Sequence, residues 1–157
     1  VFTPKAMLRL RGATSAVEDF TQGRFEPVID DDRGLDRNAV KRVLVHSGKI
    51  HWDLRTELEK NPNPEIALVR LEQLYPTPID ELKAITDSYP NAELVWVQDE
   101  PENQGAWPFL ALEFAPVPGN RQFRAVTRPA AASPATGSSK VHAVEQVALL
   151  KEALTLG

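Results

Sequence analysis

VKRVLVHSGKIHWDLRTELEKNPNPEIALVRL, residues 40–71, contains two strand patterns with a helix pattern between them. Residues 40–46 are rich in β-branched side chains and predict the first strand. Residues 52–60 predict the helix, with Leu54 and Leu58 one turn apart. Residues 66–71 are almost entirely apolar, as expected of a strand in a sheet that is covered on both faces. This order predicts two parallel strands joined by a helical crossover.

The same alternation continues on both sides of this stretch. Thr77 and Pro78 predict a further helix start, with Thr as the N-cap and Pro at the first helical position. The buried stripe of that helix is Ile79, Leu82 and Ile85. The remaining predicted strands are residues 25–30, 94–97 and 123–127, and the remaining predicted helices are one from a Ser15–Glu18 capping box to Gly23, residues 105–114 and residues 140–154.

The last predicted helix has a broad apolar side that we expect to face the core. This side consists of Val141, Val144, Val147, Ala148, Leu150 and Leu154. Strands that alternate with helices predict an α/β fold with a mostly parallel five-stranded sheet and helices on both faces. We expect residues 1–157 to form one domain. Val1 and Phe2 lead directly into Thr3-Pro4 without an initiator Met or a signal peptide, so we expect a C-terminal fragment of a longer, multidomain chain.

The composition excludes several classes of protein. The chain is 42% hydrophobic and 25% charged, and no apolar run is long enough to span a membrane. The net charge of −4 does not favour nucleic acid or an anionic membrane as a partner. The chain has no cysteine and three histidines, which excludes thiolate chemistry and leaves little for a transition-metal site.

Three stretches carry residues suited to chemistry. Residues 137–140 could hold an anion at a helix N-terminus, although a Ser N-cap beside a surface Lys is the more ordinary interpretation, and His142 could join such a site or be structural. His46 and His51 flank residues 47–49 and could belong to a nucleophile and base or to a basic pocket with Lys49, although a strand-to-helix loop with a polar surface is the more ordinary interpretation. Lys5, Arg9 and Arg11 form a basic stretch that could meet phosphates, although a solvated face is commoner. No glycine-rich nucleotide motif occurs.

Two further loops follow predicted strands, where ligands and partners bind in parallel sheets. Residues 100–107, EPENQGAW, combine acids, amides, Gly and Trp, and residues 72–76 are EQLYP. A structural loop remains the alternative for both.

These loops resemble a known enzyme family. Residues 70–76 resemble the R-[IL]-E-Q-L-Y-P segment of the transketolase-type C-terminal domain in 2-oxo acid dehydrogenases. Residues 100–107 resemble the E-P-x-N-x-G-A-W loop of the 2-oxoglutarate dehydrogenase first component. Residues 2–9, 47–49 and 128–142 resemble its F-T-P-K-x-x-L-R, S-G-K and closing motifs, and residues 138–146 resemble the actinobacterial form. The signature residues, expected at interfaces, are Glu72, Gln73, Tyr75, Pro76, Glu100, Asn103, Gln104, Gly105, Trp107, Arg128, Gly137 and His142.

The resemblance implies a thiamine-diphosphate enzyme of the tricarboxylic acid cycle that decarboxylates 2-oxoglutarate and passes the succinyl unit to a lipoyl group on the succinyltransferase component. In that family, thiamine diphosphate and magnesium lie between the two preceding domains of a homodimer, so no catalytic, cofactor or metal residue is expected in this chain. The resemblance implies subunit contacts, support of the walls of the active site, and part of an acetyl-CoA activator site in a bacterial, cytoplasmic enzyme. We expect Lys5, Arg9 and Lys49 to contact the activator phosphates, because cationic side chains suit phosphate.

Two alternatives remain at this point. The chain could be an independent α/β module that binds an anion at the Gly137 loop. It could also be the same domain from another 2-oxo acid dehydrogenase, because this domain does not select the oxo acid.

Overall fold

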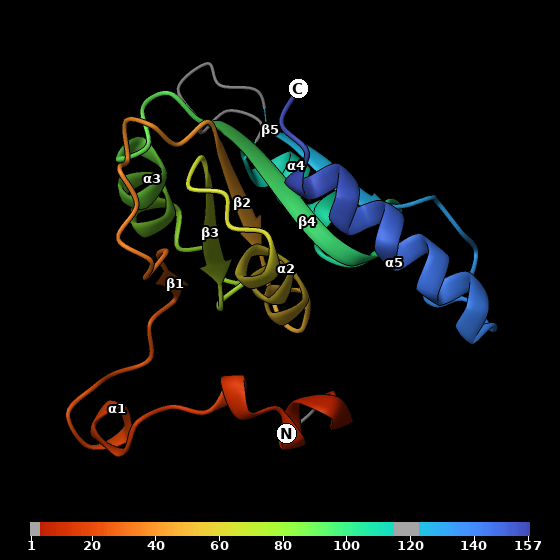
Figure 1. The fold of residues 1–157 in the computed structure, drawn as a ribbon, viewed down its shortest axis with the longest axis horizontal. Coiled ribbons are helices and arrows are strands. Elements are labelled where there is room, and N and C mark those ends of the chain that lie inside the picture. The colour runs from red at the N-terminus through yellow and green to blue at the C-terminus, as the bar shows by residue number, and fades with distance from the viewer. Residues whose placement is uncertain (1–3, 115–122) are drawn as a thin grey trace.

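The computed structural model describes residues 4–114 and 123–157. Its centre is a five-stranded sheet in the order β1-β3-β2-β4-β5 (Figure 1). Strands β3, β2, β4 and β5 run parallel to one another, and β1 pairs antiparallel with β3 at the edge of the sheet. The predicted mostly parallel sheet is therefore confirmed. The strands are β1 (Val28–Ile29), β2 (Arg42–His46), β3 (Ile66–Leu71), β4 (Glu93–Pro101) and β5 (Phe123–Arg128).

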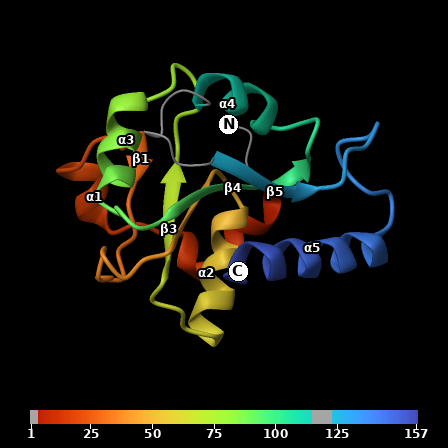
Figure 2. The same cartoon turned by 90° about the horizontal axis from the view of Figure 1, so that it is seen from above.

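Helices cover both faces of the sheet, as predicted (Figure 2). Helices α2 and α5 pack on one face, and α3 and α4 pack on the other. The helical elements are η1 (Lys5–Arg9), η2 (Arg11–Ala13), α1 (Val17–Thr21), α2 (Ile50–Lys60), α3 (Ile79–Asp87), α4 (Trp107–Phe114) and α5 (Ser139–Leu154). None of the helices in the described residues is both long and apolar enough to cross a membrane.

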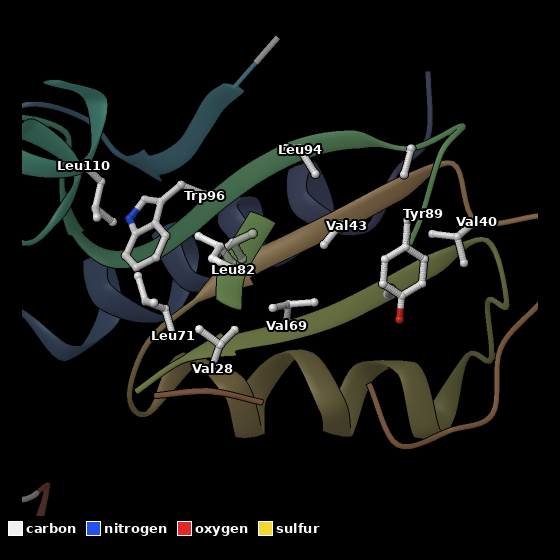
Figure 3. Packing of buried hydrophobic residues seen from close by; sticks show 13 residues of the cluster. Val28, Val40, Val43, Val69, Leu71, Leu82, Tyr89, Leu94, Trp96 and Leu110 are labelled. Atoms are coloured by element: carbon white, nitrogen blue, oxygen red, sulfur yellow. The ribbon is translucent and has the colours of Figure 1, made fainter. Parts of the chain in front are cut away.

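The alternation of side chains along each strand divides the core in two. Val43 and Val45 of β2 point into the cluster under α3 and α4, which includes Trp96 (Figure 3). Leu44, between them, points into the cluster under α2 and α5. The almost continuous apolar sequence of β2 and β3 follows from this coverage on both faces.

Two predicted helix caps are wrong. Helix α1 begins at Val17, and the Asp19 carboxylate accepts the backbone N–H of Ala16 at 3.0 Å, so Ser15 and Glu18 do not form the capping box. The Thr77 hydroxyl donates to the Leu74 carbonyl at 3.0 Å, and Pro78 occupies the N-cap position of α3. In both cases the N-cap lies one residue later than predicted, and another local hydrogen bond forms in place of the predicted one.

The predicted buried side of the last helix is also wrong from Val141 to Ala148, because Ala148 is exposed as well. Val141, Val144 and Val147 are 46%, 71% and 68% exposed, whereas Leu149 and Ala153 are buried. The N-terminal end of α5 extends beyond the sheet (Figure 1), and the helix contributes buried side chains to the core only from Leu149 onward.

Candidate functional site

The crossovers of β2 and β3 pass on opposite faces of the sheet, which makes the carboxyl ends of β2 and β4 a topological switch point. Ligands of open α/β sheets bind at such points. A cavity of about 670 Å³, called here the switch-point crevice, opens at this place. Its lining is Pro4, Ser47, Gly48, Lys49, Leu74, Trp96, Gln98, Asp99, Glu100, Gly105, Ala106 and Phe109.

Lys49 is the cation of this crevice, and two carboxylates already hold it. Its Nζ lies 2.6 Å from Asp53 Oδ2 and 3.3 Å from Asp99 Oδ2. Burial lowers the pKa of Lys49, but the two carboxylates outweigh burial and leave this pKa raised. The ammonium group is therefore fixed in its charged form, with most of its charge compensated inside the protein.

Behind Asp99, a second cation is buried against the middle of α5. Arg128 is 6% exposed and lies 3.3 Å from Glu145, 2.6 Å from the Gln146 side-chain oxygen and 4.0 Å from Asp99 Oδ1. Gln146 in turn donates to Asp53 at 3.0 Å. These contacts connect the ends of β2, β4 and β5 with α5 in one charged network.

Residues 100–107 form a braced wall of the crevice, and Gln98 is the brace. Its side-chain oxygen accepts the Trp96 indole N–H and the Trp107 backbone N–H, each at 2.9 Å. Its amide nitrogen donates to the carbonyls of Gln104 at 2.7 Å and Pro101 at 3.0 Å. Sequence reasoning missed Gln98, because a lone glutamine at a strand end has no distinguishing local pattern.

The amides of the same loop fasten it to the chain after β5. Asn103 and Gln104 both donate to the Ala131 carbonyl, at 3.0 and 2.8 Å, and Ala131 donates back to Asn103 at 3.0 Å. Gly105 has φ +65°, and a Cβ there would lie 2.9 Å from Glu100 Cβ. Glu100 is exposed at the rim. The motif therefore holds the loop in one conformation. The side-chain amides of Asn103 and Gln104 bond to the backbone of Ala131, and Gly105 allows the positive φ that the turn needs.

Comparison with known proteins now gives the family. The family model described as 2-oxoglutarate dehydrogenase C-terminal matches residues 14–154. The chain belongs to this family. It is 45% identical to the "Multifunctional 2-oxoglutarate metabolism enzyme" of Mycolicibacterium vanbaalenii, over 98% of this chain and 13% of that protein. It is also 45% identical to the "2-oxoglutarate dehydrogenase E1/E2 component" of Corynebacterium glutamicum, over 98% of this chain and 13% of that protein. The chain thus spans about an eighth of the length of these relatives, and the family predicted from the motifs is confirmed.

In this 2-oxoglutarate dehydrogenase C-terminal domain, the signature turn at residues 72–76 lies beside the crevice. The Gln73 side chain donates to the Pro76 carbonyl at 2.6 Å, and the Tyr75–Pro76 peptide bond is cis. Tyr75 is 81% exposed, and its ring packs edge-on against Phe109 of the crevice. Glu72 lies 3.7 Å from Arg70. The turn therefore presents an exposed aromatic ring at the carboxyl edge of the sheet.

The 2-oxoglutarate dehydrogenase C-terminal domain does not gather the remaining predicted site residues at the crevice. Ser138 accepts the Val141 backbone N–H at 3.5 Å, so the loop before α5 provides a Ser N-cap, and Gly137 has no neighbour that a Cβ would meet. His142 is exposed on α5. Lys5 and Arg9 are exposed on η1, whose preceding residue Pro4 does line the crevice.

His46 and His51 are buried and hydrogen-bonded to each other at 2.9 Å. Neither lines the crevice. The prediction that these two side chains belong to a polar, exposed loop is therefore wrong. His51 lies in the first turn of α2, and its ring stacks on that of His46.

Among residues 4–114 and 123–157, no group of three or more His, Asp or Glu could hold a metal ion.

Proposed function

We propose that this chain is the C-terminal domain of a thiamine-diphosphate-dependent enzyme that decarboxylates 2-oxoglutarate and transfers the succinyl unit to a lipoyl group of the succinyltransferase component. The match of residues 14–154 to the family model carries the proposal. The identity of 45% to two actinobacterial 2-oxoglutarate enzymes supports it. Thiamine diphosphate and magnesium bind in other parts of the longer enzyme, which works in the bacterial cytoplasm.

In this proposal the domain has a structural role: it supports the wall of the active site and provides subunit contacts, and it contributes no catalytic residue. The Gln98 brace and the amides of residues 103–104 hold the loop at the end of β4 rigid, as a wall of a neighbouring active site requires. The exposed Tyr75 ring and the signature residues around it provide contacts to the preceding domains and to the second subunit of a homodimer.

The proposal also assigns the domain a part in control by acetyl-CoA. Lys5 and Arg9, both exposed, contact phosphates of the activator, together with Lys49 at the crevice. Because Asp53 and Asp99 hold Lys49, activator binding there requires Lys49 to exchange one carboxylate for a phosphate.

Two measurements on one preparation test the proposal. Intact-mass analysis with N-terminal sequencing is expected to find a polypeptide much larger than 17.4 kDa that continues upstream of Val1. Turnover of that polypeptide is expected to require thiamine diphosphate and magnesium and to favour 2-oxoglutarate over pyruvate and branched-chain 2-oxo acids. A preference for another oxo acid would show that the domain serves a different dehydrogenase. A natural 17.4 kDa protein with its own start codon would refute the proposal.

A further inference from the structure

A second cavity, of about 160 Å³, lies between α2, the loop at residues 30–33 and the β1–β3 edge of the sheet. None of its lining residues lines the switch-point crevice. Its apolar wall includes Leu58, and its polar wall includes His51, Arg33, Arg55 and Arg70. We call it the His51 cavity.

The hydrogen bonds of the two histidines fix which nitrogen of His51 carries a proton. His46 Nδ1 lies 2.9 Å from the Leu44 carbonyl, which can only accept, so Nδ1 of His46 carries the hydrogen. The neutral His46 ring then accepts at Nε2, and His51 Nδ1–H donates to it at 2.9 Å. The Nε2 of His51 is left as an acceptor, and it has no hydrogen-bond partner within residues 4–114 and 123–157.

Burial lowers the pKa of His51 to about 3, with further lowering from His46 and from the charges of Arg70 and Arg55. At neutral pH the ring is therefore uncharged and keeps the lone pair on Nε2. His51 is only 5% exposed and lines the cavity, so little of its ring is in contact with bulk water.

The three guanidinium groups of the cavity differ in how well they are already bound. Arg33 is held by Asp31 at 2.5 Å and by the Ile66 carbonyl at 2.6 Å. Arg55 is held by Asp32 at 3.1 Å and by Glu59 at 3.4 Å. Arg70 has, within the described part of the chain, only Glu72 at 3.7 Å, too long for a hydrogen bond.

Arg70 stands beside the histidine pair. In the parallel register of β2 and β3 it is the partner of His46, and the alternation of side chains places both on the face that α2 covers. The cavity therefore combines a strong donor with unused capacity, Arg70, and an unused acceptor, His51 Nε2.

We propose that the His51 cavity binds a small oxyanion that carries its own O–H group, with the oxyanion on Arg70 and the O–H donating to His51 Nε2. A monohydrogen or dihydrogen phosphate group and a 2-hydroxycarboxylate both have this chemistry. The four acidic side chains of the lining disfavour more highly charged ligands, such as diphosphates and triphosphates. A cavity of about 160 Å³ admits only a small molecule or the end group of a larger one.

The test uses the ¹⁵N-labelled 157-residue chain at pH 7 and constant ionic strength. The nitrogen resonances of His51 are followed during titration with inorganic phosphate, glycolate and acetate. We expect saturable shifts at His51 Nε2 with phosphate, with glycolate or with both, and which of them binds identifies the source. Acetate has no O–H at this pH, and we expect it to bind at least about tenfold more weakly, because Nε2 then stays unpaired.

Arg70→Gln and Arg55→Gln form a matched pair from the same cavity. We expect Arg70→Gln to weaken binding about 10- to 100-fold, the effect of losing a charge-assisted hydrogen bond. Arg55→Gln is expected to stay within about threefold, since its guanidinium is already bound to Asp32 and Glu59. Equal binding of acetate, shifts that never saturate, or equal losses in the two variants would overturn the proposal. If Arg70→Gln unfolds, the comparison of the three anions on the unmodified chain decides.

Discussion

At the scale of single residues, Gly105 shows how a turn and its packing act together. Its φ of +65° is one that L side chains rarely adopt, and a Cβ would also lie 3.0 Å from both polar atoms of the Gln98 amide. Gly48 has a similar φ, +73°, but a Cβ at that position would meet nothing within 4 Å. Substitution of Gly48 therefore introduces backbone strain alone, whereas substitution of Gly105 introduces backbone strain together with steric crowding.

We predict that Gly105→Ala lowers the free energy of unfolding by about 3 kcal/mol, from strain and from displacement of the Gln98 amide. Gly48→Ala should cost only about 1–2 kcal/mol, from strain alone. Urea denaturation of both variants checks this. Equal decreases in the free energy of unfolding for the two variants would contradict the prediction, since they would mean that the Gln98 amide moves aside without an energetic cost.

The buried histidine pair predicts an acid-sensitive domain. Burial lowers the pKa of His46 to about 4 and that of His51 to about 3, below the value near 6.5 expected in the unfolded chain. The unfolded state therefore binds protons first, so stability is full above about pH 6.5 and falls as the pH drops toward 4.

We predict a slope approaching about 1.4 kcal/mol per pH unit for each histidine between pH 6 and 4.5. Denaturation at several pH values measures it, and the His46→Gln/His51→Gln double variant should lose most of it. If that variant does not fold, histidine ¹⁵N spectra give a second check. Protonation of either ring above pH 6 would contradict the prediction.

At the scale of elements, α5 is two half-helices with different surroundings. Leu149 and Ala153, near its C-terminal end, are buried, whereas Val141, Val144 and Val147, which precede them in the helix, are exposed. The apolar residues of the first half thus contribute little to the stability of this domain.

We predict that Leu149→Ala lowers the free energy of unfolding by about 2–5 kcal/mol, as truncation in a packed core does. Val147→Ala, on the same helix but 68% exposed, should change it by no more than about 0.5 kcal/mol. Chemical denaturation of the pair is sufficient. A large loss in Val147→Ala would show that the exposed side of α5 at Val147 packs on the chain.

At the scale of the whole molecule, Arg42 connects the central strand β2 with the C-terminal end of α5 and with the neighbouring strand β4. From β2 it donates to the carbonyls of Ala153 at 2.8 Å and Thr155 at 2.6 Å, and it pairs with Glu93 of β4 at 2.5 Å. Burial raises the pKa of Glu93, but the bonds and charges from Arg42 and Arg124 outweigh it and leave this pKa lowered. The guanidinium thereby satisfies the carbonyl of Ala153 in the last turn of α5 and that of its C-cap residue Thr155, which have no partner within the helix.

We predict that Arg42→Met costs about 3 kcal/mol, because buried carbonyls lose their donor, and that the last turn of α5 exchanges its amide hydrogens faster. Lys41→Met is the control: its pair with Glu65 is exposed, and its loss should cost at most about 1 kcal/mol. Denaturation and hydrogen exchange measure both. Unchanged exchange in α5 after Arg42→Met would refute the capping role.

Much of the architecture was predictable because it depends on neighbours in sequence. The β-branched runs of β2 and β3, the spacing of Leu54 and Leu58, and the glycines at turns act within a few residues of one another. The predicted N-caps of α1 and α3 were wrong by one residue, because several nearby side chains compete for the same backbone groups.

Residue order along the chain therefore established the α/β class, the alternation of strands and helices, and the family motifs. It did not establish which apolar side of α5 is buried, since that depends on where the helix leaves the sheet. Nor did it establish the Lys49–Asp99 contact, the Arg128–Gln146 contact or the His51 cavity. These join strands and helices that are distant in sequence, and only the packing of the sheet brings their side chains within hydrogen-bonding distance.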